Sequence, residues 1–259
     1  MNIKRFLLRQ KHINYYFKGK QFLQNSHYLN AEKLSAIEIQ KTPSRTDIIN
    51  YLLSLKPDDR YYLEIGVRNP EHNFKHIKAA HKYSVDPGIE FKSNPVDFKM
   101  TSDDFFSKLT KNEILSRTMR FDLVFIDGLH LAEQVNRDIE NAFKYLKDDG
   151  FIVLHDCNPS SEWHAREAFL YKHTPAQDYW NGTTWKAFLK WRSNPNVNSC
   201  CIDCDWGVGI LSKTHKIGNC INQTNPFFEF HMLDERRKEL LNLIDFDDFK
   251  NDIEHELNV

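Results

Sequence analysis

The segment from Phe121 to Asp127 constrains the fold of this chain most strongly, because it reads Phe-Asp-Leu-Val-Phe-Ile-Asp and is followed at once by a glycine. A short, nearly continuous apolar run of this kind is typical of a strand that is buried on both faces. Apolar residues then recur at helical spacing between Val135 and Leu146, and a second apolar run covers residues 151–156. This strand–helix–strand order predicts a parallel sheet with helices on both faces.

Five further segments with shorter apolar or alternating patterns are expected to extend this sheet to seven strands. They cover residues 61–66, 82–86, 96–100, 199–203 and 207–212. A short turn separates the last two, which predicts a hairpin with one strand antiparallel to the rest. The predicted fold class is therefore α/β: a Rossmann-like, doubly wound seven-stranded sheet with an antiparallel last strand and helical additions at both ends.

The chain divides by pattern into three parts that are expected to pack as one compact domain. These are a helical N-terminal extension (residues 1–45), an α/β domain (46–215) and a helical C-terminal extension (216–259). The C-terminal helices are expected to cover a sheet edge or the ligand cleft. Hydrophobic residues make up 41% of the 259 residues, which is enough for one sizeable core.

Charge and hydropathy exclude several classes of partner. The net charge is −1, so no general basic excess favours nucleic acid. No acidic residue precedes Glu32, whereas the tail from Asp234 onward is mainly acidic. We interpret these ends as solvated surfaces, with a patch for an anionic partner as the alternative. No apolar run approaches the ~20 residues of a membrane span, and none resembles a signal peptide. The sequence thus predicts a cytoplasmic protein, and its five cysteines are expected to be reduced, with the lone Cys201-x-x-Cys204 pair not binding zinc.

Acidic and histidine residues follow successive predicted strands. Ligands of an open parallel sheet bind beyond the carboxyl ends of its strands, and core packing does not need charged groups there. The residues at these ends are Glu64 and Gly66, Asp86, Thr101 and Ser102, Asp127 and His130, and His155 and Asp156. We therefore predict a functional crevice along this edge of the sheet.

The turn after the first strand indicates which kind of ligand the crevice takes. It reads Glu64-Ile-Gly66-Val-Arg-Asn-Pro and lacks the G-x-G-x-x-G pattern of a dinucleotide fold. With a single glycine the backbone leaves less room for a pyrophosphate, so a ligand without phosphates is favoured. Asp86 lies about twenty residues further on and can accept hydrogen bonds from two ribose hydroxyls.

Together these features resemble the class I S-adenosylmethionine-dependent methyltransferases, over residues 46–212. The resemblance implies that Glu64 and Gly66 face the amino-acid end of the cofactor and that Asp86 binds its ribose. It also implies that Thr101 and Ser102 meet the adenine.

One departure concerns the turn itself, which in this family usually holds further glycines. Here Arg68, Asn69 and Pro70 stand in their place. The carboxylate end of S-adenosylmethionine is therefore expected to be held differently, by Arg68 or Asn69.

A narrower resemblance comes from Phe125-Ile-Asp-Gly-Leu-His130 together with Leu154-His-Asp-Cys-Asn-Pro159. These motifs resemble a branch of sugar and glycoside O-methyltransferases and cephalosporin-hydroxylase-like proteins. The resemblance implies that Asp127 and Asp156 bind a divalent cation such as Mg²⁺ and that His130 is the general base. Asp127 is expected to be the second catalytic residue and to contact the cofactor as well. His155 stands where the glycoside enzymes can carry another carboxylate, which leaves metal dependence open.

The segment between the fifth strand and the hairpin is rich in tryptophan. Trp163, Trp180 and Trp185 lie there, and tryptophan faces stack well on sugar rings. We expect them, with His155, to line the acceptor site. The alternative is a helix that packs its tryptophans on the sheet.

The hypothesis from sequence is an S-adenosylmethionine-dependent O-methyltransferase that acts on a sugar or another small-molecule hydroxyl, with a homo-oligomer left open. A nicotinamide-dependent oxidoreductase is disfavoured by the missing glycines. An iron-dependent hydroxylase would need two histidines and a carboxylate, which His130, His155 and Asp127 could supply. A non-catalytic binding or scaffold protein with a methyltransferase fold is the third alternative.

Overall fold

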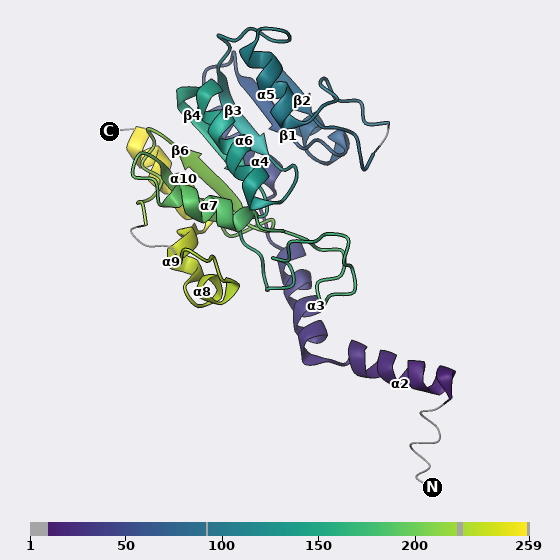
Figure 1. Ribbon diagram of the computed structural model, residues 1–259. Coiled ribbons are helices and arrows are strands. Elements are labelled where there is room, and N and C mark those ends of the chain that lie inside the picture. The colour runs from purple at the N-terminus through teal and green to yellow at the C-terminus, as the bar shows by residue number, and fades with distance from the viewer. Residues whose placement is uncertain (1–9, 92, 222–224, 258–259) are drawn as a thin grey trace.

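A seven-stranded mixed sheet forms the centre of the molecule (Figure 1). The computed structural model describes residues 10–91, 93–221 and 225–257. The strands are β1 (Tyr61–Ile65), β2 (His81–Val85), β3 (Phe121–Ile126), β4 (Leu146–Leu154), β5 (Asn198–Ile202), β6 (Val208–Ser212) and β7 (Leu243–Ile244), in the order β2-β1-β3-β4-β6-β5-β7. β6 runs antiparallel to β4 and β5, whereas the other neighbouring pairs are parallel. The predicted fold class, including the antiparallel strand of the hairpin, is confirmed.

The strand expected at residues 96–100 does not form. Phe98 makes a single parallel bridge to Val85, because side chains take over the pairing beside it. The Ser84 backbone N–H donates to Asp97 Oδ2 at 2.9 Å, and the Asp97 N–H donates to Ser84 Oγ at 2.9 Å. The seventh strand is instead β7, which joins β5 at the opposite edge of the sheet, inside the region expected to be only helical.

Helices cover both faces of the sheet. One layer contains α4 (Arg45–Ser54) and α10 (Phe246–Leu257), and the other contains α5 (Ser102–Thr110), α6 (Ala132–Tyr145) and α7 (Thr184–Arg192). A Ser44–Asp47 capping box starts α4 and satisfies backbone N–H groups at the beginning of this helix.

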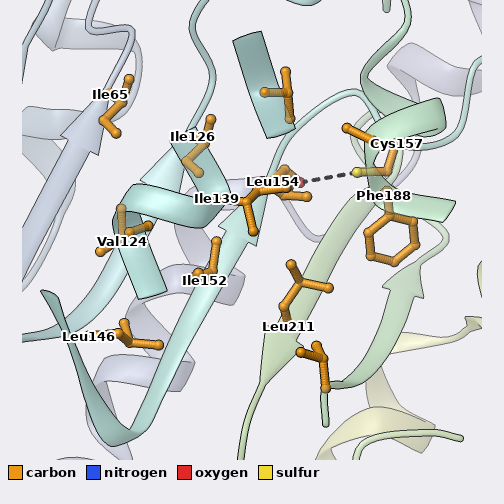
Figure 2. Packing of buried hydrophobic residues seen from close by; sticks show 14 of the residues in the cluster. Ile65, Val124, Ile126, Ile139, Leu146, Ile152, Leu154, Cys157, Phe188 and Leu211 are labelled. Atoms are coloured by element: carbon orange, nitrogen blue, oxygen red, sulfur yellow. Dashed lines mark hydrogen bonds between the residues drawn. The ribbon is translucent and has the colours of Figure 1, made fainter. Parts of the chain in front are cut away.

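The central strands are buried on both faces, as their continuous apolar runs predict. Along β3, Val124 and Ile126 pack under α6, while Leu123 and Phe125 belong to the cluster under α4. Figure 2 shows the first of these clusters, in which Ile139 of α6 lies over the neighbouring strands. This two-sided burial holds the ends of β3 and β4 in a fixed register, with Ile126 opposite Leu154.

The remaining helices lie at the ends of the chain and at one short connection. They are α2 (Lys11–Leu23), α3 (Ser26–Ile39), α8 (Phe230–Glu235) and α9 (Arg237–Leu241), with the 3₁₀ turns η1 (Pro70–His72) and η2 (Phe74–His76) after β1. α2 and α3 form an arm that leads away from the sheet (Figure 1). None of the helices within the described ranges is long and apolar enough to cross a bilayer.

Gly66 brings the turn after β1 against the end of β3. Its φ is +91°, and a Cβ at this position would overlap the backbone carbonyl of Asp127. The close approach is fixed by backbone hydrogen bonds from the Gly66 N–H to Val85 O at 2.8 Å and from the Asp127 N–H to Ile65 O at 2.9 Å. Both the conformation and the space therefore require glycine here.

We predict that Gly66→Ala lowers the free energy of unfolding by about 2–4 kcal/mol, because it adds a steric overlap to a strained backbone conformation. Gly128→Ala is the matched control, since its Cβ would lie an ordinary 3.7 Å from Ile65 Cγ2. That variant should change stability by less than about 1 kcal/mol. Urea unfolding followed by circular dichroism measures both, and equal losses in the two variants would contradict this account.

Candidate active site

A cavity of about 570 Å³ opens beyond the carboxyl ends of the central strands. Its lining includes every residue that the sequence assigned to the cofactor: Glu64, Gly66, Arg68, Asn69, Asp86, Thr101, Ser102 and Asp127. His130, His155, Asp156 and Trp180 line the same cavity. The structure therefore brings together the residues at five predicted strand ends, although the strand before Thr101 is reduced to one bridge.

The part of the cavity near β1 and β2 is shaped by short-range hydrogen bonds. The Gly88 N–H donates to Asp86 Oδ1 at 2.6 Å, which fixes that carboxylate at the end of β2. Thr101 caps α5 by accepting from the Asp104 N–H at 3.2 Å. Arg68 forms an ion pair with Glu90 at 2.9 Å, on the rim of the cavity. Asn69 accepts from a backbone N–H of η1.

Glu64 is buried, with 3% of its surface exposed. Tyr62 Oη donates to Glu64 Oε2 at 2.5 Å, and Asn73 Nδ2 donates to the same oxygen at 2.9 Å. Burial nevertheless dominates and raises the pKa of Glu64 to about 7. The carboxyl thus changes protonation near neutral pH, beside the turn that Gly66 makes.

His130 lies between two carboxylates that follow adjacent strands. Its Nε2 is 3.3 Å from Asp127 Oδ1, and its Nδ1 is 3.2 Å from Asp156 Oδ2. The imidazole stacks on the Trp180 ring, with 5.1 Å between the centroids and 23° between the planes. Nδ1 also lies 3.2 Å from the Trp180 carbonyl oxygen. These contacts fix the orientation of the ring at the mouth of the cavity.

The charges of this cluster shift its pKa values strongly. Burial by itself would lower the pKa of His130, but the negative charge of Asp156 and the hydrogen bond to Asp127 raise it to about 9. Burial would also raise the pKa of Asp127, yet His155, His130 and Arg45 hold it well below its usual range. The cluster therefore favours a charged Asp127 beside a charged His130.

His155 extends the cluster on its buried side. Its Nδ1 lies 3.3 Å from Asp127 Oδ1 and 3.1 Å from Asp156 Oδ2. Its Nε2 lies 3.1 Å from Asp205 Oδ1 and 2.9 Å from Arg45 Nη1. Carboxylates thus lie beside both ring nitrogens of His155, which contacts Asp127 and Asp156 on their buried side.

Sequence reasoning did not identify Arg45 and Asp205 as members of this cluster. Arg45 is the first residue of α4, and its backbone N–H donates to Asp205 Oδ2 at 2.8 Å. Burial would raise the pKa of Asp205, but His155 and Arg45 lower it to about 2. Their only indication in the sequence is position, since one follows a capping serine and the other lies in the hairpin turn.

Asp156 adopts a backbone conformation that few non-glycine residues accept, with φ at +60°. Asn181 Nδ2 donates to Asp156 Oδ1 at 2.8 Å, and the Cys157 N–H donates to Gly207 O at 2.9 Å. These bonds hold the carboxylate toward His130. Strain of this kind is typical of functional positions.

The segment after β4 is locked onto the loop that carries His130. The Thr183 N–H donates to His130 O at 2.7 Å, and the Ala132 N–H at the start of α6 donates to Thr183 Oγ1 at 2.8 Å. At Gly182, with φ at +61°, a Cβ would overlap the His130 carbonyl. The segment after β4 therefore supports the position of His130 directly.

The donor set fits a divalent cation. Within residues 10–91, 93–221 and 225–257, Asp127, His130 and Asp156 form the one group of three whose ligand atoms all lie within 4.8 Å of one another. Two carboxylate oxygens and an imidazole nitrogen are ligands that such ions accept. The set holds one histidine and two carboxylates, so it differs from the two-histidine pattern of an iron-dependent hydroxylase.

Two of the tryptophans expected at the acceptor site lie elsewhere. Trp185 is 1% exposed and packs in the core beside Phe230, because α7 turns this side of the helix to the sheet. For Trp185 the structure thus favours the core-packing alternative. Trp163 lines a separate groove next to α3. Trp180 is the one of the three that contacts the cluster.

A family model described as a methyltransferase domain matches residues 23–157, more than half of the chain. The chain belongs to this family of S-adenosylmethionine-dependent class I methyltransferases. A comparison of the methyltransferase with curated proteins finds no match.

Solved structures of other methyltransferases resemble this one only partly. The O-methyltransferase from Bacillus cereus, in complex with SAH, shares 13% identity over 80% of this chain and 100% of that chain, with a TM-score of 0.41. The O-methyltransferase TomG from Streptomyces achromogenes, in complex with SAM, shares 12% identity over 80% of this chain and 98% of that chain, with a TM-score of 0.42. The MycE methyltransferase of the mycinamycin pathway, in complex with Mg, SAH and mycinamycin VI, shares 13% identity over 76% of this chain and 57% of that chain, with a TM-score of 0.40. Because these TM-scores lie below 0.5, the family assignment rests on the domain match.

We predict that Glu64→Gln makes the protein more stable than wild type at high pH but not at low pH. The folded-state pKa of about 7 exceeds the unfolded value of about 4.3, so the stabilising proton is lost as pH rises through 7. Glutamine stays neutral and still offers an oxygen to Tyr62 and Asn73.

Urea unfolding at pH 4, 5, 6, 7 and 8 should show a stability difference near zero at pH 4, which lies below the unfolded pKa, and the difference should open between about pH 4.3 and 7. The difference should grow to about 1–3 kcal/mol in favour of the variant at the highest pH. A difference that does not depend on pH would mean that the Glu64 carboxyl has an ordinary pKa.

Proposed function

We propose that this methyltransferase transfers a methyl group from S-adenosylmethionine to a hydroxyl oxygen of a small molecule, specifically a sugar, with His130 as the general base. The observation that carries the proposal is the place of the His130 ring. It lies between Asp127 and Asp156, stacked on Trp180, in the same cavity as the residues expected to hold the cofactor.

The two ends of the cavity suit two different ligands. Glu64, Gly66, Asp86, Thr101 and Ser102 line the part beyond β1 and β2, where a ribose and an adenine would lie. Asp86 can accept hydrogen bonds from ribose hydroxyls there. S-adenosylmethionine supplies a methyl group on a positively charged sulfur, which the nearby carboxylates favour.

The acceptor part of the cavity is bordered by aromatic rings. The Trp180 ring stacks on His130, and its centroid lies 5.2 Å from that of the Phe169 ring. Both residues line the cavity, together with Asp178. An indole face with a carboxylate nearby suits a sugar, whose ring has apolar faces and polar edges.

His130 can take up the hydroxyl proton at Nε2. A carbonyl oxygen only accepts hydrogen bonds, so Nδ1 carries the hydrogen that faces Trp180 O at 3.2 Å. A sugar hydroxyl is far less acidic than imidazolium, so the proton moves to Nε2 as the new oxygen–carbon bond forms. Asp127 and Asp156 hold the pKa of His130 near 9. Positive charge placed against these carboxylates lowers that pKa and so favours the neutral imidazole.

Asp127 and Asp156 would hold a divalent cation such as Mg²⁺, which would lower the pKa of the acceptor hydroxyl and orient it. The two carboxylates follow adjacent strands and are supported from behind by His155. Most of the remaining rate is expected from alignment of the acceptor oxygen with the methyl group.

Calorimetric titration with S-adenosylhomocysteine tests the donor site, with NAD as the negative control. We predict that the first binds and the second does not. Asp86→Asn should weaken S-adenosylhomocysteine binding by about tenfold or more, because it removes a charged acceptor from the ribose hydroxyls. Protein that is folded by circular dichroism but binds neither ligand would point to the scaffold alternative.

His130→Asn should lower kcat by about 10²–10⁴-fold while leaving the affinity for S-adenosylhomocysteine nearly unchanged, because the ring acts only on the acceptor proton. The assay uses a panel of monosaccharide and glycoside acceptors, with and without Mg²⁺, and detects methylated product by mass spectrometry. His81→Asn is the matched histidine control, because His81 begins β2 at the end away from Asp86 and the cavity. Methylation of phenols or proteins but of none of the sugars would contradict the proposed acceptor.

A further inference from the structure

The arm formed by α2 and α3 carries most of the large apolar side chains that the molecule exposes. Of fifteen such side chains among the described residues, eight lie on this arm. They are Tyr15, Tyr16, Phe17, Phe22, Leu23, Leu29, Ile37 and Ile39. α2 buries no residue at all, and it lies at the far end of the arm from the sheet (Figure 1).

α2 has little to stabilise it by itself. It is 13 residues long, which is marginal for an isolated helix in water. Gly19 lies in its interior, where a Cβ would meet no other atom within 4 Å, and Gln10 gives no side-chain cap. A helix of this kind, with exposed aromatic rings, is typical of a segment that is completed by a partner surface.

A second cavity, of about 910 Å³, is distinct from the candidate active site. We call it the α3–α9 groove, because it lies between α3, the segment after β4, and α8 with α9. Apolar side chains in its lining include Leu34, Ile37, Trp163 and Phe230. The groove therefore offers an apolar surface beside the root of the arm.

The α3–α9 groove is acidic. Its lining holds five acidic side chains, Glu38, Glu162, Asp203, Glu229 and Asp234, and two basic ones, Lys41 and Arg237. Both basic groups are already paired, Lys41 with Glu38 at 2.8 Å and Asp203 at 2.6 Å, and Arg237 with Asp234 at 2.8 Å. Glu162 and Glu229 thus add negative charge that these bases do not balance.

The arm has the opposite charge. Lys11, Lys18 and Lys20 lie on α2 among its aromatic residues, and the sequence contains no acidic residue before Glu32. Aromatic rings with lysines match an apolar groove with unbalanced carboxylates. In this structure α2 extends from α3 away from α8 and α9, so it does not lie in the groove of its own chain (Figure 1). A second copy of the chain is the partner that presents both an arm and a groove.

We propose that α2 of one copy lies in the α3–α9 groove of a second copy and that the exchange is reciprocal. The methyltransferase is then an arm-exchanged dimer with a two-fold axis. The inference does not depend on the proposed acceptor or base, because none of the arm residues lines the candidate active site.

Charge reversal tests the exchange. The arm variant carries Lys18→Glu with Lys20→Glu, and the groove variant carries Glu162→Lys with Glu229→Lys. We expect wild type to sediment as a dimer in analytical ultracentrifugation and each variant to self-associate at least about tenfold more weakly. A 1:1 mixture of the two variants should restore the dimer, because each arm then meets a groove of opposite charge.

Lys108→Glu with Lys111→Glu, at the exposed end of α5, is the matched control and should leave the dimer intact. Circular dichroism checks that every variant is folded. The proposal is overturned if wild type is a monomer at all concentrations, if neither variant changes association, or if the mixture fails to restore the dimer. Binding of monomeric wild type to phosphatidylserine vesicles through Lys18 and Lys20 would instead identify the arm as a membrane-surface helix.

Discussion

Two carboxylates at the ends of adjacent parallel strands, one half-buried and one buried, set the main electrostatic constraint of this molecule. Asp127 and Asp156 follow β3 and β4, and their side chains are only 18% and 8% exposed. Buried negative charges need positive partners, and His130 and His155 supply them from opposite sides. The position of each histidine thus follows from the same requirement, although one faces the cavity and the other faces inward.

This requirement connects parts of the chain that are far apart in sequence. His155 is balanced by Asp205 from the β5–β6 turn, and Asp205 is in turn paired with Arg45 at the start of α4. Arg45 also faces Asp127, with 3.9 Å between Nε and Oδ2. The helix before the sheet and the hairpin at its far side are therefore tied to one charge network. Displacing α4 would leave Asp127 and Asp205 with less compensation, so the site and the packing of this helix are coupled.

The sequence was sufficient where short-range pattern and sheet geometry decide the result. Parallel strands end at one edge, so the grouping of Asp127, His130 and Asp156 could be predicted without knowing the packing. Residues 96–100 have a strand-like pattern, but the exchange of hydrogen bonds between Ser84 and Asp97 replaces the ladder. β7 has two residues, too few to show a period. Arg45 and Asp205 join the site through tertiary packing, which no local pattern encodes.

On the proposed function, the network also determines which ligands the cavity favours. The carboxylates of the site already face positively charged side chains. An incoming sulfonium or divalent cation therefore competes with protonated His130 for the same carboxylates. Among the positively charged side chains of the site, Arg45 does not lose its proton in a protein. His155 also contacts a third carboxylate, that of Asp205. His130 is the one that faces the cavity and an aromatic ring. Entry of positive charge is therefore linked to release of the His130 proton, which is the change a general base requires before it can accept a proton from the acceptor.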